Sequence, residues 1–357
     1  MRLVAVDLFC GIGGLTKGLT LAGIDVVAGI DIDETCSFVY EKNNDSKFIC
    51  EDISTFNKET LHNLYPSDSI KILVGCAPCQ PFSKYSSKYR KNGHKDDKWK
   101  LLSSFGNLIE SELPDVVSME NVPNLEKEKV FKEFLTILKD NKYNIDYKVI
   151  NCKNYGVPQN RRRLVLLASR LGEIKIIEPF CDDKNVVTVK QAIFDLPKIA
   201  AGEICSTDAL HQSSGLSAIN LQRIKQSRQG GTWRDWDENL RLDCHKKVSG
   251  KTYPSVYGRM SWDKPSPTIT TQFYGYGNGR FGHPEQNRAI SLREGAILQS
   301  FPANYIFEDA DHPINRHDTA IHIGNAVPVE LGRAIGISII NHLKSIGGQN
   351  ERVIDKC

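Results

Sequence analysis

The chain has 357 residues, of which 40% are hydrophobic and 25% are charged. This composition is typical of a folded globular protein and excludes a disordered or collagen-like chain. Lysine and arginine total 46 against 43 acidic residues, and the resulting net charge of +3 neither requires nor excludes a polyanionic partner. The length is more than one hydrophobic core usually serves, so we expect two domains.

The cysteines and the N-terminus indicate the cellular compartment. Only one pair among the ten cysteines, Cys76 and Cys79, is closely spaced, so the chain lacks the pattern of a disulfide framework. The N-terminus lacks the apolar region and the small-residue cleavage site of a secretion signal. No stretch approaches the ~20 apolar residues of a membrane-spanning helix. We therefore expect a reduced, cytoplasmic protein.

The first half of the chain alternates short apolar runs with segments of helical spacing. Buried strands are predicted at 3–9, 25–30, 70–74, 115–119 and 163–168, with helical patterns at 34–43 and 125–139 between them. Such alternation is typical of an α/β fold in which helices cover both faces of a parallel sheet. Ligands of these folds bind at the carboxyl ends of the strands, so the residues that follow each apolar run carry the most information.

The pattern weakens in the second half of the chain. Residues 200–290 are richer in Ser, Gln, Gly and Trp, and helical spacing returns only at 291–299 and 329–343. We expect an α/β domain over 1–185 and a smaller, irregular domain with a hinge over 186–310. The C-terminal segment, 311–357, is expected to complete the first domain.

A glycine-rich turn follows the first strand, in the sequence Phe9-Cys10-Gly11-Ile12-Gly13-Gly14-Leu15. Between a strand and a helix, such a turn lets backbone amides approach an anionic group at the helix N-terminus. The dinucleotide fingerprint requires a third glycine where this chain has Thr16, so the match to an NAD site is poor. The tighter turn suits a smaller anion, such as the carboxylate of a methionine moiety, although a purely structural turn fits equally well.

Acidic residues follow the next two strands. Asp31 ends the second strand, where a carboxylate can accept hydrogen bonds from ribose hydroxyls, and Asp52 stands at the end of the third. Either acid alone could instead cap a helix. Together with the glycine turn, they place polar groups at three successive strand ends, which favours a nucleoside cofactor.

The fourth strand runs into Gly75-Cys76-Ala77-Pro78-Cys79-Gln80-Pro81-Phe82-Ser83. A C-x-x-C pair can be a redox centre or half of a zinc site, but no second pair or histidine cluster completes a zinc site, so we predict no metal. A buried, inert cysteine is another common outcome. Cys79 stands between two prolines at the ligand-binding edge, which favours an exposed, nucleophilic thiolate.

The fifth strand ends at Glu120 and therefore brings a carboxyl group to the same edge. A buried glutamate at this point could present a proton to a ring nitrogen of a base. Further along the chain, Arg161 and Arg163 alternate in a predicted strand, which would place both side chains on one face. A solvated basic edge is the alternative interpretation of these arginines.

These motifs resemble those of the DNA (cytosine-5)-methyltransferases that use S-adenosylmethionine, of the bacterial restriction-modification type. The resemblance covers nearly the whole chain and keeps the order of the family's motifs. It includes Asp7-Leu8-Phe9-Cys10-Gly11-Ile12-Gly13-Gly14, Pro78-Cys79-Gln80-Pro81-Phe82-Ser83, Glu120-Asn121-Val122, Gln159-x-Arg161-x-Arg163, Arg293-Glu294 with Leu298-Gln299-Ser300-Phe301-Pro302, and Gly324-Asn325-Ala326-Val327-Pro328.

The resemblance implies a Rossmann-like methyltransferase sheet with a second, smaller target-recognition domain. It also implies that the Cys79 thiolate attacks carbon 6 of cytosine, which makes carbon 5 nucleophilic. Glu120 would hydrogen-bond the ring nitrogen and the exocyclic amine. Arg163 and Arg161 would hold the carbonyl oxygen and the phosphate of the flipped nucleotide, and Asn121 would order the strand end beside the cysteine.

The same resemblance implies which residues bind the cofactor, S-adenosyl-L-methionine. Asp31 stands where the family often has Glu, so its shorter side chain must lie closer to the ribose. The implied cofactor residues are Phe9, Gly11, Gly13, Gly14, Asp31, Ile32, Asp52, Ile53 and Asn325.

Duplex DNA is the implied substrate, and its cytosine must leave the helix to react. Residues 84–100 hold seven basic side chains against two acidic ones, and residues 205–260 hold nine against five, interleaved with Trp233, Trp236, Tyr253 and Tyr257. Gln212, Gln222, Gln226 and Gln229 are of the type that reads base edges. We expect a monomer that acts on duplex DNA, with a possible cognate restriction endonuclease.

Two other functions remain open on the sequence alone. A tRNA cytosine-5 methyltransferase of similar fold is the first alternative, although the Cys-Phe-Thr signature of that branch is absent. A DNA-binding regulator that has lost the reaction is the second, and the presence of Cys79, Glu120 and Arg163 argues against it. An NAD oxidoreductase is excluded by the glycine spacing.

Overall fold

The structure is a computed structural model that describes residues 2–78 and 100–354. It forms two compact units. The first unit comprises the chain up to Tyr155, Arg162–Phe180 and the chain from Val327 onward. The second unit comprises Gly156–Arg161 and Cys181–Ala326.

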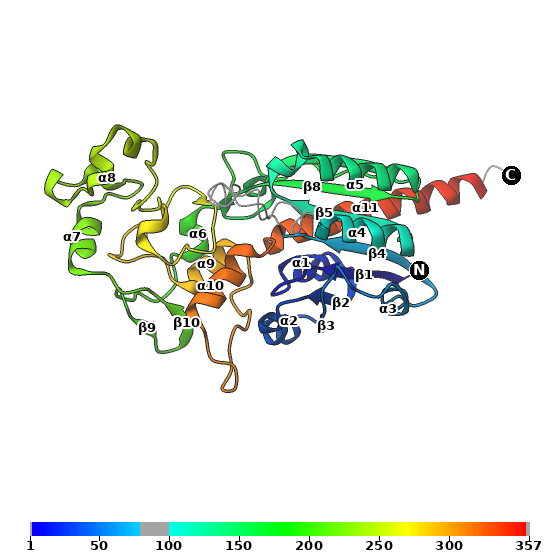
Figure 1. Ribbon diagram of the computed structural model, residues 1–357, viewed down its shortest axis with the longest axis horizontal. Coiled ribbons are helices and arrows are strands. Elements are labelled where there is room, and N and C mark those ends of the chain that lie inside the picture. The colour runs from blue at the N-terminus through cyan, green and yellow to red at the C-terminus, as the bar shows by residue number, and fades with distance from the viewer. Residues whose placement is uncertain (1, 79–99, 355–357) are drawn as a thin grey trace. The chain divides into compact units, whose positions relative to one another are not determined.

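A seven-stranded sheet forms the centre of the first unit (Figure 1). Its strands are β1 (Arg2–Leu8), β2 (Asp25–Asp31), β3 (Lys47–Cys50), β4 (Ser69–Gly75), β5 (Val116–Asn121), β6 (Asn144–Asn151) and β8 (Arg162–Ser169). They pair in the order β3-β2-β1-β4-β5-β8-β6. The strands predicted at 3–9, 25–30, 70–74, 115–119 and 163–168 all lie within a residue or two of β1, β2, β4, β5 and β8.

The direction of one strand differs from the prediction. The pairs from β3 through β5 are parallel, but β8 runs antiparallel to both β5 and β6. The predicted all-parallel sheet is therefore wrong at this strand. A parallel neighbour needs a crossover of a dozen or more residues, and only 152–161 separate β6 from β8, so the chain returns in the opposite direction.

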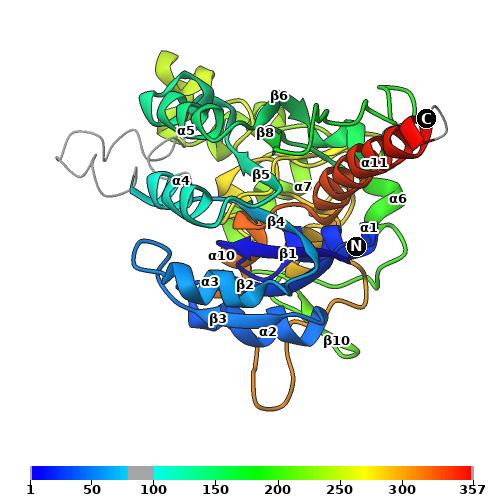
Figure 2. The same ribbon diagram turned by 90° about the vertical axis from the view of Figure 1, so that its right-hand side faces the viewer.

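Helices cover both faces of the sheet (Figure 2). On one face α3 (Lys58–Leu64), α4 (Lys100–Glu112) and α5 (Lys129–Asp140) share the main core with the strands through buried residues such as Leu61, Phe105 and Phe134. On the other face α1 (Gly14–Ala22) packs against α11 (Val329–Ile354). A short 3-10 turn leads into α2 (Ser37–Asn43), which lies beside β3.

The second unit consists of short elements joined by irregular segments, as the weak periodicity predicts. Its strands are β7 (Gln159–Asn160), β9 (Ile204–Cys205), β10 (Asp208–Gln212) and β11 (Ser266–Pro267). Its helices are α6 (Val189–Ile193), α7 (Ala218–Gln226), α8 (Asp243–Lys246), α9 (Leu292–Leu298) and α10 (Arg316–Asn325). The helix predicted at 291–299 corresponds to α9.

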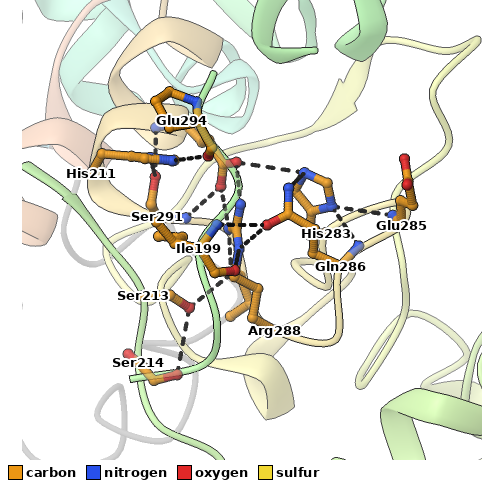
Figure 3. A network of polar contacts seen from close by, with 12 residues as sticks. Ile199, His211, Ser213, Ser214, His283, Glu285, Gln286, Arg288, Ser291 and Glu294 are labelled. Atoms are coloured by element: carbon orange, nitrogen blue, oxygen red, sulfur yellow. Dashed lines mark hydrogen bonds and ion pairs between the residues drawn. The ribbon is translucent and has the colours of Figure 1, made fainter. Parts of the chain in front are cut away.

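A buried polar network fixes the start of α9 (Figure 3). Arg288 Nη1 and Nη2 each donate to one oxygen of Glu294 at 2.7 Å. His283 Nε2 lies 3.6 Å from the same carboxylate. Ser291 caps the helix, because its Oγ accepts from the Glu294 amide at 3.0 Å and also lies 2.8 Å from His211 Nδ1. The unit thus contains a fully buried ion pair in place of an apolar centre at this point.

One stretch of the described chain, Arg316–Ile346, is long and apolar enough to cross a membrane by length and composition. Within this stretch, 67% of the most apolar 18-residue segment is buried inside the protein. Core helices of folded proteins meet the same criterion, so this stretch is weak evidence for a membrane span.

Candidate active site

The glycine turn after β1 has a backbone that only glycine adopts easily. Gly11 and Gly13 have φ angles of 50° and 81°, and Phe9 has a φ of 61°. A Cβ added to Gly11 would meet nothing within 4 Å, so open space adjoins the turn. Gly14 begins α1, and the preceding Gly13 offers no side-chain cap to the helix amides. The uncapped first turn of α1 can therefore present backbone N–H groups to an anion.

Asp31, at the end of β2, holds this turn in place. Its Oδ2 accepts a hydrogen bond from the Gly11 amide at 2.8 Å, and its Oδ1 accepts one from the Asp33 amide at 3.0 Å. The carboxylate therefore joins the ends of β1 and β2, and its remaining lone pairs are those that a ribose hydroxyl could use. Next to it, Ile32 is 67% exposed and offers an apolar contact at the same edge.

The two residues predicted after β3 have different surroundings. Asp52 Oδ1 accepts from the Ser54 amide at 2.8 Å, so it caps a turn and not a helix, which was the alternative considered for it. The Ile53 side chain is buried in the core of the first unit, so only its backbone can reach a ligand. Their assignment to the cofactor stays a prediction.

Asp7 is the first residue of the motif that contains the glycine turn, and the sequence alone indicates no role for it. Its side chain is 1% exposed, and its Oδ2 accepts from Thr16 Oγ1 at 2.7 Å. Thr16 Oγ1 lies 3.2 Å from the Tyr40 hydroxyl oxygen. The same hydroxyl oxygen lies 2.8 Å from Ser46 Oγ. Burial raises the pKa of Asp7 to about 7. The signal available in the sequence was an acid inside an otherwise apolar strand.

Glu120 lies at the centre of a buried polar cluster where three adjacent strands meet. Arg163 Nε, from β8, lies 2.9 Å from Glu120 Oε1, and the two side chains are 13% and 3% exposed. Cys76 Sγ, just after β4, lies 2.7 Å from Glu120 Oε2. The structure thus brings together two of the predicted catalytic residues, Glu120 and Arg163, and adds a thiol that received no catalytic role from the sequence.

Asn121 connects this cluster to the segment that precedes position 79. Its Nδ2 donates to the Ala77 carbonyl at 3.0 Å, and its Oδ1 accepts from the Val122 amide at 2.9 Å. Cys79 itself lies outside the described residues, and so does the basic stretch 84–100 except for Lys100.

Arg161 belongs to the second unit, and its guanidinium binds backbone carbonyls. Its Nη1 donates to the Ile269 carbonyl at 2.9 Å, and its Nη2 lies 3.4 Å from the carbonyls of Gly324 and Ala326. The predicted sharing of one strand face with Arg163 is wrong, because the chain leaves β7 before residue 161 and enters β8 only at residue 162. A catalytic role for Arg161 stays a prediction.

Two further motif residues of the second unit, Gln159 and Gln299, bind one another. Gln159 Nε2 donates to Gln299 Oε1 at 2.9 Å, and its Oε1 accepts from the Ile269 amide at 2.9 Å. Gln299 Nε2 donates in turn to the Ile323 carbonyl at 2.7 Å. Asn325 follows in the exposed last position of α10. These contacts bring motifs that are far apart in the sequence close together in the folded second unit.

Most of the aromatic residues that are interleaved with the basic side chains of 205–260 form a small core. Trp233, Trp236 and Tyr257 pack with Tyr276, and the Arg223 guanidinium lies 5.3 Å from the ring centre of Trp236. This packing removes their rings from any direct reading of bases.

The four glutamines named from the sequence divide in the same way. Gln226 is bonded to Asp237, and Gln212 Oε1 accepts from Arg316 at 3.0 Å. Gln222 and Gln229 are exposed. The exposed pair therefore stays available for base contacts.

Comparison with known proteins decides the family. The family model described as C-5 cytosine-specific DNA methylase matches residues 3–341. The chain belongs to this family. The methylase is 50% identical over 344 residues to the Type II methylase M.HgiDII of Herpetosiphon aurantiacus, with 96% of each chain covered. It is 34% identical to the Type II methyltransferase M1.BsuMI of Bacillus subtilis, over 93% of this chain and 79% of that relative.

Solved structures support the fold. A prophage-encoded protein of Escherichia coli, described as a DNA modification methyltransferase, has a TM-score of 0.70 at 22% identity, over 96% of this chain and 100% of its own. The methyltransferase EhMeth of Entamoeba histolytica has a TM-score of 0.62 at 18% identity, over 96% and 99%. The predicted Rossmann-like methyltransferase fold is confirmed. The methylase is a DNA (cytosine-5)-methyltransferase, and the tRNA alternative has less support.

Proposed function

We propose that this methylase transfers the methyl group of S-adenosyl-L-methionine to carbon 5 of a cytosine flipped out of duplex DNA, through a transient bond to Cys79. The observation that carries the proposal is the buried pair of Glu120 and Arg163 at the carboxyl edge of the sheet. Asn121 binds the backbone of Ala77, two residues before Cys79, so the pair and the cysteine segment share this edge.

The first unit fits the proposed cofactor. The open space beside Gly11 and the uncapped first turn of α1 can take the methionine carboxylate on backbone amides. Asp31 has carboxylate lone pairs for the ribose, and the exposed Ile32 offers an apolar contact for the adenine. Phe9 and Gly14 flank the same turn. When bound, S-adenosyl-L-methionine supplies an electrophilic methyl group on a positively charged sulfur.

The protein residues then act on the cytosine ring. The Cys79 thiolate forms a bond to carbon 6, and Glu120 holds the ring nitrogen and the exocyclic amine as electron density moves toward carbon 5. Carbon 5 takes up the methyl group as the bond between that group and the cofactor sulfur breaks, which leaves S-adenosyl-L-homocysteine. Loss of the carbon-5 proton to solvent water then breaks the bond to carbon 6, expels the Cys79 thiolate and restores the aromatic ring. Arg163 keeps Glu120 oriented and holds the carbonyl oxygen of the base.

The second unit is proposed to choose the target sequence, and the predicted domain limits of 186–310 fall inside its main segment, Cys181–Ala326. Both curated relatives described above carry Type II names, which supports a modification enzyme of a restriction-modification system. A cognate endonuclease for the same site, a monomeric state and a cytoplasmic location are part of this proposal.

Transfer of tritium from labelled S-adenosyl-L-methionine to duplex DNA tests the proposal. The wild-type protein is expected to label DNA of mixed sequence, whereas Cys79→Ser is expected to lose the activity and Glu120→Gln to keep only a small residual rate. Bisulfite sequencing of DNA from cells that express the protein then reports the methylated carbon and its sequence context. Absence of labelling on every natural DNA, or equal labelling by Cys79→Ser, would contradict the proposal.

Competition with tRNA distinguishes duplex DNA from tRNA, the other substrate class that the sequence leaves open. The proposal predicts that excess tRNA leaves the labelling of duplex DNA nearly unchanged and receives no methyl group itself. Preferential labelling of the tRNA would show that tRNA, and not duplex DNA, is the substrate.

A further inference from the structure

Cys76 contacts the carboxyl group of Glu120, although the mechanism above assigns it no role. Its Sγ lies 2.7 Å from Glu120 Oε2, and the two residues are 44 positions apart in the sequence. The backbone of Cys76 is tied to the sheet, because its amide donates to the Leu8 carbonyl at 3.3 Å. The contact is therefore made by a side chain whose main chain is held by β1.

The two oxygens of Glu120 have different partners. Arg163 Nε lies 2.9 Å from Oε1, whereas the Cys76 thiol lies at Oε2. The Cys76 thiol is the donor of this contact, and Glu120 Oε2 accepts its proton. Among the described residues, Oε1 has the ion pair with Arg163 but no hydrogen bond, so the directed contact that limits rotation of the carboxyl group is the one from the thiol at Oε2.

We propose that Cys76 is a positioning residue for methyl transfer, whose thiol holds the Glu120 carboxyl group in the plane that the cytosine requires. The inference rests on the proposed role of Glu120. A carboxylate oxygen has two acceptor sites, so Oε2 can accept from the thiol and from the exocyclic amine of cytosine together. Preorganised groups of this kind need no reorientation during the reaction, and this is how they favour the transition state.

A packing role for Cys76 makes the opposite prediction about substitutions. Cys76 is half-buried, and alanine is the milder replacement for a cysteine that only fills space. Serine, in contrast, keeps a donor at the same position. A positioning role therefore ranks serine above alanine in activity, and a packing role ranks alanine above serine.

Single-turnover methylation of duplex DNA by Cys76→Ala, Cys76→Val and Cys76→Ser tests the inference. Loss of the hydrogen bond to the Glu120 carboxyl group predicts a single-turnover rate about tenfold lower for the alanine and valine variants. The serine variant is expected to recover most of the rate. The KM for S-adenosyl-L-methionine is expected to change by less than about twofold, because the lost contact does not involve the cofactor. Cys181→Ser, a partly exposed cysteine of the second unit, serves as the matched control.

Thermal unfolding and a double variant complete the test. If Cys76 acts through Glu120, adding Cys76→Ala to Glu120→Gln lowers the residual rate no further. Wild-type rates in the alanine and valine variants, or serine and alanine variants that lose rate and thermal stability equally, overturn the inference. A Glu120→Gln variant that keeps the wild-type rate instead overturns the proposed role of Glu120, and with it the inference.

Discussion

Asp7 is a buried acid beside the cofactor turn, and burial raises its pKa to about 7. The folded protein keeps this proton up to about pH 7, whereas the unfolded chain releases it near the ordinary aspartate pKa of 3.8. The folded state therefore binds more protons between these values, and the free energy of unfolding falls as pH rises through this range. The buried Oδ1 of Asp7, which has no hydrogen-bond partner in the described part of the chain, agrees with a protonated acid.

The Asp7→Asn variant is expected to lose this pH dependence. Asparagine keeps an acceptor for Thr16 but has no charge to bury, so the variant gains about 2 kcal/mol on wild type between pH 5 and pH 8. Urea unfolding followed by circular dichroism at several pH values measures the difference. Asp45→Asn, at an exposed position, is the control. Parallel pH profiles for wild type and Asp7→Asn would show that Asp7 is ionised throughout.

At the residue scale, the sequence predicted the positions of functional groups better than their contacts. Asp31 and Glu120 do lie at strand ends, as the alternation of apolar runs required. The contact of Cys76 with Glu120 was missed because the nearby Cys79 suggested a local pair, whereas the actual partner is 44 positions away. A sequence motif also does not distinguish a buried side chain that binds backbone carbonyls from one that contacts a ligand. Arg161, whose guanidinium binds the Ile269 carbonyl, is an example.

At the scale of elements, α1 and α11 approach so closely that glycine is required between them. A Cβ on Gly18 would lie 2.4 Å from the Val329 carbonyl oxygen and 2.5 Å from the Arg333 nitrogen, both backbone atoms. Gly18→Ala is therefore expected to lower the free energy of unfolding by about 3 kcal/mol, since backbone atoms cannot move aside without separating the helices.

Gly106→Ala is the matched control for this prediction. Gly106 is also helical, but a Cβ there would meet the end of the Ile137 side chain at 2.7 Å, and this side chain can rotate. The expected change is within about 1 kcal/mol, because better helix propensity offsets the contact. Urea unfolding of both variants measures the contrast, and equal losses would contradict the close packing of α1 and α11.

The polar network at the start of α9 predicts that acid destabilises the second unit. Burial lowers the pKa of His283 to about 4. Burial alone would raise the pKa of Glu294, but the hydrogen bonds and charge of Arg288 lower it to about 2. Both groups bind protons more readily in the unfolded chain, so their stabilisation is present above about pH 6.5 and is lost progressively as pH falls toward 2.

His283→Gln is expected to remove the upper part of this acid transition. Glutamine has no charge to gain between pH 6.5 and pH 4, so the variant loses less stability than wild type over that interval. Fluorescence of Trp262, whose ring centre lies 5.1 Å from that of His283, follows unfolding at this point. An acid midpoint that is identical in wild type and variant would contradict the assignment.

The direction of β8 could not be predicted from the spacing of apolar residues in the sequence. Apolar spacing placed the strand correctly, but it carries no information on strand direction, which the short connection from β6 decides. The second unit was predicted only as irregular, because its order comes from side chains that bond backbone carbonyls across many residues. Arg259, which binds the carbonyls of Ile224 and His283, is one such side chain.

At the scale of the whole molecule, DNA binding should depend on salt through exposed basic side chains. Arg223 and Arg259 are buried and bind backbone carbonyls, so they leave exposed residues such as Lys225, Arg228 and Lys247 for phosphates. The logarithm of affinity is expected to fall with the logarithm of salt concentration, with a slope of about −0.9 per phosphate contacted. Lys247→Ala should make the slope shallower by about one unit if that side chain binds a phosphate. A slope near zero for the wild type would exclude phosphate contacts as the source of affinity.

The transient bond to Cys79 is the central claim and has a direct measurement. A duplex with 5-fluorocytosine at the target position cannot lose a proton from carbon 5, so the reaction stops with the base bonded to the protein. With S-adenosyl-L-methionine present, we expect a complex that survives denaturation and whose peptide map places the base on Cys79, in the wild type and in Cys76→Ser alike. No such complex on the methylated sequence, or one that maps to another residue, would contradict the account.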